Sequence, residues 1–273
     1  MPSYKIYYVD TFTNKAFTGN PAAVCVTNQP LTEVLMQKIA FELNLSETAF
    51  TYCLNKPKNL YNIRWYTPIT EVCLCGHATL ATAHILFNNS YVNSDCVSFY
   101  AQYRDLYLHA QKSSYGIALE FPRDTLQEVP TYLKQRLLNC LKLPSNCPIY
   151  QGNLTKQIII EVNNEQVVQN LQPNFKELLS IAYNLTGVAV TAKSISYDFV
   201  SRFFDPWEGI NEDPVTGSAH TVLAPYWSKK LNKNSLNAKQ ISSRGGKLKL
   251  QLSKQHVYIA GNSITTLKGE ILV

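Results

Sequence analysis

The chain has 273 residues, a formal net charge of +6 and an apolar fraction of 45%, which is ordinary composition for a globular protein. It contains no run of about 18 apolar residues and begins without signal-peptide architecture, which argues against a membrane or secreted protein. Its seven cysteines are an odd number and unevenly scattered, which is typical of reduced thiols. We therefore expect a cytoplasmic protein that makes no contact with a membrane.

The first half of the chain combines strands with two helices. A helix should begin after Thr32, which can cap it, and end near Asn44, because apolar residues recur there every four positions. A second helix should follow the tight turn that Gly76 allows and run over residues 77–87. Runs rich in β-branched and aromatic residues predict strands over residues 4–9, 22–26, 50–54, 61–65, 97–100, 106–111 and 117–121.

The second half repeats this theme after a crossover expected at residues 122–130. Helices are predicted over residues 133–143, over residues 174–184 with Leu178, Leu179 and Ala182 inward, and from Gly217 onward. Pro225 falls inside the last of these helices, so we expect it to bend the helix or start a new turn. Strands are predicted over residues 157–162, 188–192, 197–204, 248–252, 257–260 and 265–273. Few parallel βαβ patterns occur, which favours mixed or antiparallel sheets around helices.

A pair of similar segments divides the chain into halves. Residues 64–68 and 202–206 both follow the order Arg, aromatic, aromatic, any residue, Pro, at an offset of 138 residues. Each is followed by Glu, four residues, Gly, a polar residue and Ala. This second part repeats at an offset of 141 residues, because the later copy holds three extra residues. A repeat of this length predicts two similar domains of about 135 residues.

The glycines of the repeat, Gly76 and Gly217, each precede an expected helix start. Such a start presents unpaired backbone N–H groups and the positive end of the helix dipole, which together can hold a carboxylate. Two such ends, one from each copy, could hold a small dianionic or zwitterionic substrate from both sides. The alternative is that both glycines only serve tight turns.

The first copy of the repeat also contains a possible metal cluster. A structural zinc site usually combines a Cys-x₂₋₄-Cys pair with a second, distant pair of ligands. The two cysteines here are too close together, and the second copy has no thiol, so we expect no metal. The residues concerned are Cys73, Cys75, His77 and His84.

A hydrolase with a nucleophilic serine is conceivable from Ser218, His77 and Asp213. However, the sequence around Ser218 lacks the flanking glycines of the Gly-x-Ser-x-Gly elbow, which argues against this chemistry.

Glu47 is a candidate acid or base. It lies at an expected helix-to-strand junction between the apolar residues Leu45 and Ala49. Partial burial would raise the pKa of its carboxyl group and suit it to proton abstraction. The alternative is an ordinary exposed glutamate of a loop.

The positive charge is concentrated in residues 229–254, which hold eight basic residues and no acidic one. This segment is either a solvated face or a surface for an anionic partner. Few aromatic residues are interleaved with its lysines and no nucleic-acid motif occurs, which disfavours a nucleic-acid partner.

Four blocks of the sequence together resemble the PhzF family, the phenazine biosynthesis-like proteins. They occur in the family's order and spacing, and the resemblance extends from residue 8 to about residue 270. The animal members known as MAWD-binding proteins are especially similar around residues 201–227. The blocks are residues 19–24 (GNPAAV), 45–50 (LSETAF), 74–79 (LCGHAT) and 212–220 (EDPVTGSAH).

The resemblance implies the α+β, diaminopimelate-epimerase-like fold. That fold has two pseudo-symmetric domains, each a curved mixed sheet around a central helix, with the site in the cleft between them. We place the N-terminal domain at residues 1–124 and the C-terminal domain at residues 125–263. The C-terminal strand, residues 264–273, is expected to return to the first domain.

The resemblance also implies a cofactor-free isomerase that acts, as a homodimer, on a small carboxylated and cyclic metabolite. Glu47 would move the proton, while Asn20, His77, Asp213 and Ser218 would bind the substrate, with the N–H groups of Gly76 and Gly217 on its carboxylate. Epimerases of the wider superfamily use two cysteines. The repeat aligns Cys75 with Thr216, so one thiol is missing and two-thiol racemisation is disfavoured.

The alternative from the same resemblance is a binding or adaptor protein with a vestigial cleft. The animal relatives are named as partners of a WD-repeat protein, which motivates it. The presence of the motif residues in both halves counts against it.

Overall fold

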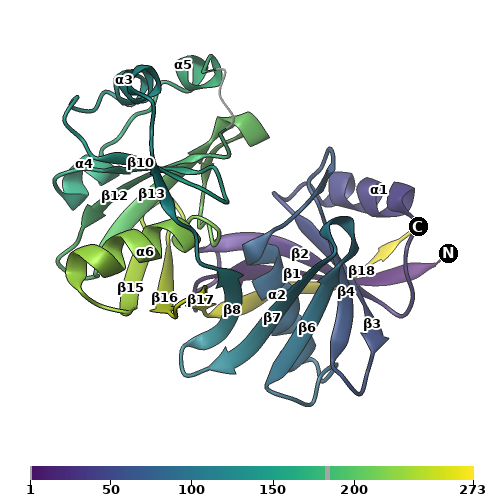
Figure 1. Ribbon diagram of the computed structural model, residues 1–273. Coiled ribbons are helices and arrows are strands. Elements are labelled where there is room, and N and C mark those ends of the chain that lie inside the picture. The colour runs from purple at the N-terminus through teal and green to yellow at the C-terminus, as the bar shows by residue number, and fades with distance from the viewer. Residues whose placement is uncertain (1, 182–184) are drawn as a thin grey trace. The chain divides into compact units, whose positions relative to one another are not determined.

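The computed structural model describes residues 2–181 and 185–273 (Figure 1). The chain divides into two compact units. Unit 1 consists of Met1–Glu120 and Tyr258–Val273, and unit 2 consists of Phe121–Val257. Among the described residues, no helix combines the length and apolar character needed to cross a membrane.

Unit 1 is a mixed sheet whose strands surround the helix α2, Gly76–Asn88 (Figure 1). The pairs β2–β3 and β4–β6 are parallel, and β18 runs antiparallel to β1, so the C-terminal strand belongs to the first unit. The strands are β1 (Ser3–Thr11), β2 (Asn20–Thr27), β3 (Thr48–Asn55), β4 (Leu60–Tyr66), β5 (Glu71–Val72), β6 (Cys96–Ala101), β7 (Leu106–Ser113), β8 (Gly116–Pro122), β17 (His256–Gly261) and β18 (Ser263–Leu272). The strands β8 and β17 carry the chain across the boundary between the units.

Helix α2 is buried on all sides. Every residue from His77 to Phe87 is buried, as expected of a helix that is apolar around its whole circumference. Its buried threonines satisfy their hydroxyl groups within the helix: Thr79 donates to the carbonyl of Cys75 at 2.6 Å, and Thr82 donates to that of Ala78 at 2.8 Å. The prediction of a helix after Gly76 is therefore confirmed.

Helix α1, Glu33–Leu43, leads into the strand that carries Glu47. The Thr32 hydroxyl caps it by accepting a hydrogen bond from the amide of Leu35, and Asn44 ends it in the left-handed conformation with φ 49°. Both predicted ends are confirmed. Because the helix stops at Asn44, the chain turns within three residues into β3.

Unit 2 repeats the mixed-sheet plan with more helices. The pairs β11–β12 and β13–β15 are parallel. Its strands are β9 (Leu126–Glu128), β10 (Ile149–Gly152), β11 (Ile158–Glu161), β12 (Val188–Lys193), β13 (Phe199–Asp205), β14 (Ile210–Asp213), β15 (Ser235–Gln240) and β16 (Gly246–Leu252). Its helices are α3 (Thr131–Cys140), α4 (Glu165–Gln169), α5 (Phe175–Leu179) and α6 (His220–Leu231), and short 3₁₀ turns cover Gln102–Arg104 in unit 1 and Pro206–Glu208 here.

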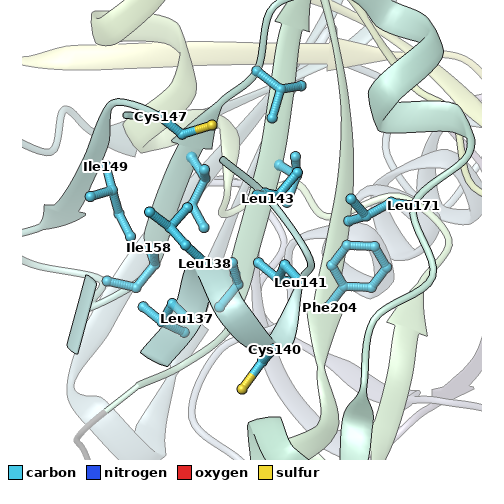
Figure 2. Packing of buried hydrophobic residues seen from close by; sticks show 14 of the residues in the cluster. Leu137, Leu138, Cys140, Leu141, Leu143, Cys147, Ile149, Ile158, Leu171 and Phe204 are labelled. Atoms are coloured by element: carbon cyan, nitrogen blue, oxygen red, sulfur yellow. The ribbon is translucent and has the colours of Figure 1, made fainter. Parts of the chain in front are cut away.

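The core of unit 2 lies between α3 and the sheet. Leu137 and Leu138 of α3 are buried together with Ile158 of β11 and Phe204 of β13 (Figure 2). The partly buried ring of Phe175 meets that of Phe204, with the ring centroids 6.0 Å apart. The helix and strands predicted over residues 133–143, 157–162 and 197–204 thus supply side chains to this core.

Several predicted elements of unit 2 need correction. The expected crossover at residues 122–130 contains a strand, β9. The helix predicted over residues 174–184 is only α5, Phe175–Leu179. Leu178 is buried as predicted, but Leu179 is 53% exposed, because one helical turn has room for one inward position here. Ala182 lies outside the described residues.

The last helix starts later than predicted, and its proline does not end it. Helix α6 begins at His220 rather than Gly217, because residues 217–219 form tight turns with bonds between residues three apart. Pro225 lies within the helix and cannot donate to the carbonyl of Thr221. The backbone amide of Asp124 supplies the missing donor at 3.2 Å, so the helix continues past the proline.

The repeated Arg and Glu form the same ion pair in both units. In unit 1, Nε and Nη2 of Arg64 lie 2.7 and 2.6 Å from the two carboxylate oxygens of Glu71. In unit 2, Nε and Nη2 of Arg202 lie 2.7 and 2.8 Å from those of Glu212. This two-pronged geometry joins neighbouring strands just before each glycine turn. The repeated Arg and Glu thus hold together the two strands that precede each glycine turn.

Candidate active site

Glu47 follows α1 and immediately precedes β3. Its backbone carbonyl accepts a hydrogen bond from the amide of Ala23 in β2 at 3.1 Å, which ties the residue to the sheet. Its side chain is only 16% exposed, so the alternative of an ordinary exposed loop glutamate does not fit.

His77 lies in the first turn of α2 and faces Glu47. Its Nε2 atom is 3.2 Å from Oε2 of Glu47, and its Nδ1 atom is 3.4 Å from Sγ of Cys75. The hydroxyl of Ser46 lies 3.5 Å from Nε2 and also donates to the carbonyl of Pro21 at 3.4 Å. The loop before β3 and the start of α2 therefore bring a carboxylate, an imidazole, a thiol and a hydroxyl into one cluster.

The charges in this cluster follow from its contacts. Burial alone would raise the pKa of Glu47, but the charge of His77 and hydrogen bonds from His77, Ser46 and Cys75 outweigh it, and the net pKa is lowered. Our prediction of a raised pKa is therefore wrong, because a partner distant in sequence neutralises the buried charge. Burial would likewise lower the pKa of His77, yet Cys75 and Glu47 raise it well above its usual value. Burial raises the pKa of Cys75, with a further contribution from Glu47. The directions for Glu47 and His77 favour an ionised carboxylate facing a protonated imidazole.

The same three side chains could in principle hold a metal ion, since one ligand atom from each lies within 4.8 Å of the others. Metal binding requires a neutral imidazole and a thiolate, whereas the pKa directions favour the protonated forms of both. The donor set therefore suits proton transfer better than metal binding. His84, which the sequence also suggested as a metal ligand, is not part of this group of three residues. Its ring nitrogens instead contact Thr265 at 3.0 Å and Asn88 at 3.1 Å.

The start of α2 supplies donors beside the pair. The first amides of any helix, here those of Gly76 and His77, have no acceptor within the helix. Asn20 lies at the start of β2 and is fully buried, and its backbone carbonyl accepts from the Thr11 hydroxyl at 2.9 Å. Four of the predicted site residues, Asn20, Glu47, Gly76 and His77, thus lie in unit 1.

Unit 2 holds the other predicted site residues at the end of β14, which is Asp213, and in the loop that leads from it to α6. The Thr216 hydroxyl donates to Oδ2 of Asp213 at 2.5 Å. Gln240 of β15 fixes this loop, because its Oε1 accepts from the amide of Thr216 at 3.0 Å and its Nε2 donates to the carbonyl of Asp213 at 2.7 Å. Gly217 and Ser218 form the turn that follows, and the Ser218 hydroxyl accepts from Nε2 of Gln157 at 3.0 Å.

The two glycine turns share one further contact. Thr79 bonds back to the carbonyl of Cys75, and Nδ1 of His220 bonds back to the carbonyl of Thr216 at 2.8 Å. Each bond closes the turn around the repeat's glycine. The two bonds span equivalent positions of the repeat, although the helix begins at Gly76 in one copy and at His220 in the other.

The basic segment, residues 229–254, covers the end of α6 and the strands β15 and β16. Two of its lysines pair with acids from elsewhere in unit 2: Lys230 with Glu161, and Lys233 with Asp198 at 2.6 Å. These pairs favour the interpretation of this segment as a solvated face.

Sequence reasoning missed Ser46, Gln157 and Gln240 as members of the two sites. Ser46 adjoins Glu47 and stands within a recognised block, so its position was a usable signal. The glutamines contact residues 61 and 24 positions away, and no local pattern announces such contacts.

Comparison with known proteins agrees with this description. The profile of the family described as "Phenazine biosynthesis-like protein" (PhzC-PhzF) matches residues 9–269. An uncharacterized isomerase of Halalkalibacterium halodurans is 45% identical, with 100% of both chains covered. A human phenazine biosynthesis-like domain-containing protein is 38% identical, with 97% of this chain and 98% of the other covered.

Solved structures give the same fold. A PhzF-family protein of Enterococcus faecalis superposes with a TM-score of 0.87 at 40% identity, with 100% of both chains covered. A hydroxyproline epimerase from Agrobacterium vitis superposes with a TM-score of 0.64 at 8% identity, covering 98% of this chain and 92% of the other, and shows likeness of fold alone. The predicted epimerase-like fold class is thus confirmed. The chain belongs to the phenazine biosynthesis-like, or PhzF, family.

Proposed function

We propose that this protein is a cofactor-independent isomerase that moves a proton between two carbon atoms of a small, cyclic carboxylate. The observation that carries the proposal is the buried pair of Glu47 and His77, whose Oε2 and Nε2 atoms are 3.2 Å apart. Relatives named as isomerases in Halalkalibacterium halodurans and Pseudomonas aeruginosa support the reaction class.

Glu47 has the properties of a proton carrier. Its carboxylate is ionised at neutral pH and can accept a proton from carbon, which leaves negative charge on the substrate. The imidazolium of His77 first balances the charge of Glu47. Once Glu47 is neutral, the same positive charge and the nearby amides of Gly76 and His77 can stabilise the substrate anion. The positive charge of His77 thus passes from balancing Glu47 to balancing the substrate anion, which stabilises the transition state more than the ground state.

The return step closes the reaction without a second reagent. Glu47, now protonated, gives its proton to another carbon of the same anion, and its carboxylate and the His77 pair are restored. No electron pair leaves the substrate, so the isomerisation needs no oxidant, reductant or cofactor. A single carrier also fits the lack of a second thiol, since Thr216 aligns with Cys75.

A carboxylate substrate is supported by the helix start at Gly76 and by a structural relative. The hydroxyproline epimerase from Agrobacterium vitis has trans-4-hydroxy-L-proline bound, a cyclic amino acid with a carboxylate. We propose the same chemical class for this chain, with Asp213, Ser218 and Gly217 as binding residues of unit 2 and Asn20 as one of unit 1. A homodimer in the cytoplasm is part of the same proposal.

Isotope exchange tests the proton transfer. The full chain is incubated in D₂O with cyclic and dihydroaromatic amino acids, and deuterium entering carbon positions is followed by NMR and mass spectrometry. Glu47→Gln removes the carrier but nearly keeps its size, so exchange should fall by about 10² to 10⁴-fold. Glu42→Gln, a change of an exposed glutamate on α1, is the matched control and should leave exchange unchanged.

Exchange that is equal in the wild type and in Glu47→Gln would rule out Glu47 as the carrier. A wild type that binds carboxylates but never exchanges deuterium into any of them would favour the binding-protein alternative instead.

A further inference from the structure

The loop over residues 152–157 of unit 2 is wound around one buried carboxylate. Asp124 is 2% exposed and accepts hydrogen bonds from the amides of Leu154 and Thr155 at 2.8 and 2.9 Å and from the Thr155 hydroxyl at 2.7 Å. A Cβ atom at Gly152 would lie 2.5 Å from Oδ2 of Asp124. The loop therefore holds a fixed shape that leaves no room for a side chain at Gly152.

Asp124 and this loop make one contact each with the start of α6 and the turn before it. The amide of Asp124 donates to the Thr221 carbonyl, the one that Pro225 leaves without its helical donor. In the other contact Gln157, one residue before β11, donates from Nε2 to Oγ of Ser218 at 3.0 Å. The first contact holds the start of α6, and the second holds the predicted substrate-binding hydroxyl in the turn before it.

The second contact decides what the Ser218 hydroxyl can do. Gln157 is only 6% exposed, so its amide cannot easily turn to water for a partner. A hydroxyl has one proton to donate and two lone pairs that accept. Because Ser218 accepts from the amide of Gln157, its own proton points to another acceptor.

We propose that Gln157 is a positioning residue that commits the Ser218 hydroxyl to donate to an anionic oxygen of the ligand, which makes unit 2 selective for carboxylates. The inference rests on the proposed substrate-binding role of Ser218. Gln157 itself does not touch the reacting atoms. It acts through the direction of one proton, and a hydrogen bond to a charged acceptor is among the stronger ones.

A double-mutant cycle on the full chain tests this inference, with benzoate as the probe and benzyl alcohol as the uncharged ligand control, both titrated calorimetrically. Ser218→Ala should weaken benzoate binding about tenfold or more. Gln157→Met should weaken it about three- to tenfold in the wild-type background and not at all in the Ser218→Ala background, because its effect passes through Ser218. Benzyl alcohol should bind equally to all variants.

Two further variants complete the cycle. Gln157→Glu keeps the side-chain length but can only accept when ionised, so it should redirect the Ser218 proton to itself and weaken benzoate at least as much as Ser218→Ala does. It also serves if Gln157→Met fails to fold. Gln127→Met, whose amide donates to Gln151 rather than to α6, is the matched control and should leave benzoate binding unchanged.

An effect of Gln157→Met that is equally large with and without the Ser218 hydroxyl would overturn the inference, as would no effect at all. Either result leaves the proposed isomerase intact if wild-type benzoate binding and deuterium exchange persist. A coupled cycle without deuterium exchange would contradict the isomerase and keep the role of Gln157. A wild type that binds no benzoate would contradict both proposals on the carboxylate.

Discussion

Nε2 of His77 lies 3.2 Å from Oε2 of Glu47, which joins the start of the buried helix α2 to the start of strand β3. Each group alone would be driven toward its neutral form by burial. Together they reverse that tendency, since the pKa of Glu47 is lowered and that of His77 is raised. This pair therefore contributes to stability as well as to the proposed chemistry, and the two roles can be separated by their pH dependence.

The first prediction concerns the stability of Glu47→Gln between pH 4 and pH 9. The lowered pKa of Glu47 stabilises the fold above the ordinary value of 4.5 and ceases to do so as the pH falls below it. The raised pKa of His77 stabilises the fold fully below 6.5, and this contribution is lost as the pH rises beyond it. The melting temperature of Glu47→Gln should thus fall below that of the wild type most clearly between pH 4.5 and 6.5, by on the order of 3 °C. The measurement is a series of calorimetric melts. A difference that stays constant over the whole range would contradict the ion pair.

The second prediction concerns the repeated ion pair of unit 2. Arg202→Lys keeps the charge but cannot contact both oxygens of Glu212 at once, and it also loses the bond from Nη1 to the Leu171 carbonyl at 2.8 Å. We expect the free energy of unfolding to fall by about 2 kcal/mol in urea denaturation. Lys112→Gln removes the exposed pair with Asp95 and is the control, with an expected change of about 0.5 kcal/mol or less. Equal losses in both variants would show that the two-pronged geometry adds nothing.

The sequence was sufficient for the elements whose causes are local. Short stretches of sequence contain the Thr32 cap, the apolar residues of α2 and the duplicated order of Arg, Glu and Gly. The structure confirms the two helices of unit 1 that were predicted from such local patterns. The repeat predicted that the two halves are alike. It did not predict that Arg and Glu within each copy pair with each other.

What the sequence could not predict depends on contacts between distant residues. The pKa of Glu47 takes its direction from His77, thirty positions away, and local burial alone gave the opposite sign. Gln240 belongs to β15, a strand with so many polar residues that it was not predicted, yet its side chain orders the loop of Asp213. The start of α6 was placed too early because a glycine before a helix does not show how many turn residues intervene.

The third prediction concerns acid stability and His220. Its imidazole is fully buried, Nδ1 donates to the Thr216 carbonyl, and burial lowers its pKa to about 4. The unfolded chain takes up this proton below 6.5 and the folded chain only near 4, so stability must fall as the pH drops between these values. The contribution of one such group reaches about 1.4 kcal/mol per pH unit. His220→Asn keeps a donor for Thr216 and removes the titration, so urea unfolding at pH 7, 6 and 5 should show a shallower acid-side loss. Parallel curves for the two proteins would contradict this assignment.

The last prediction concerns two glycines of unit 2 that share a positive φ but differ in their surroundings. Gly187 has φ +115°, and a Cβ atom there would lie 2.1 Å from the Phe203 ring, whereas Gly209 has φ +83° and nothing within 4 Å. Gly209→Ala should lower the free energy of unfolding only by the backbone strain of the left-handed region, about 1 kcal/mol. Gly187→Ala adds overpacking against a ring that is itself 2% exposed and cannot move aside, so the loss in the free energy of unfolding should reach about 3 kcal/mol or more.

The backbone carbonyl of Gly187 also accepts a hydrogen bond from the amide of Ile158 at 3.0 Å, so a shift of the backbone at Gly187 would disturb the start of β11, next to Gln157. Urea unfolding of both variants at neutral pH measures the difference. If Gly187→Ala were no less stable than Gly209→Ala, the close approach of Phe203 to this glycine would be wrong, and with it the packing that holds β11 in place.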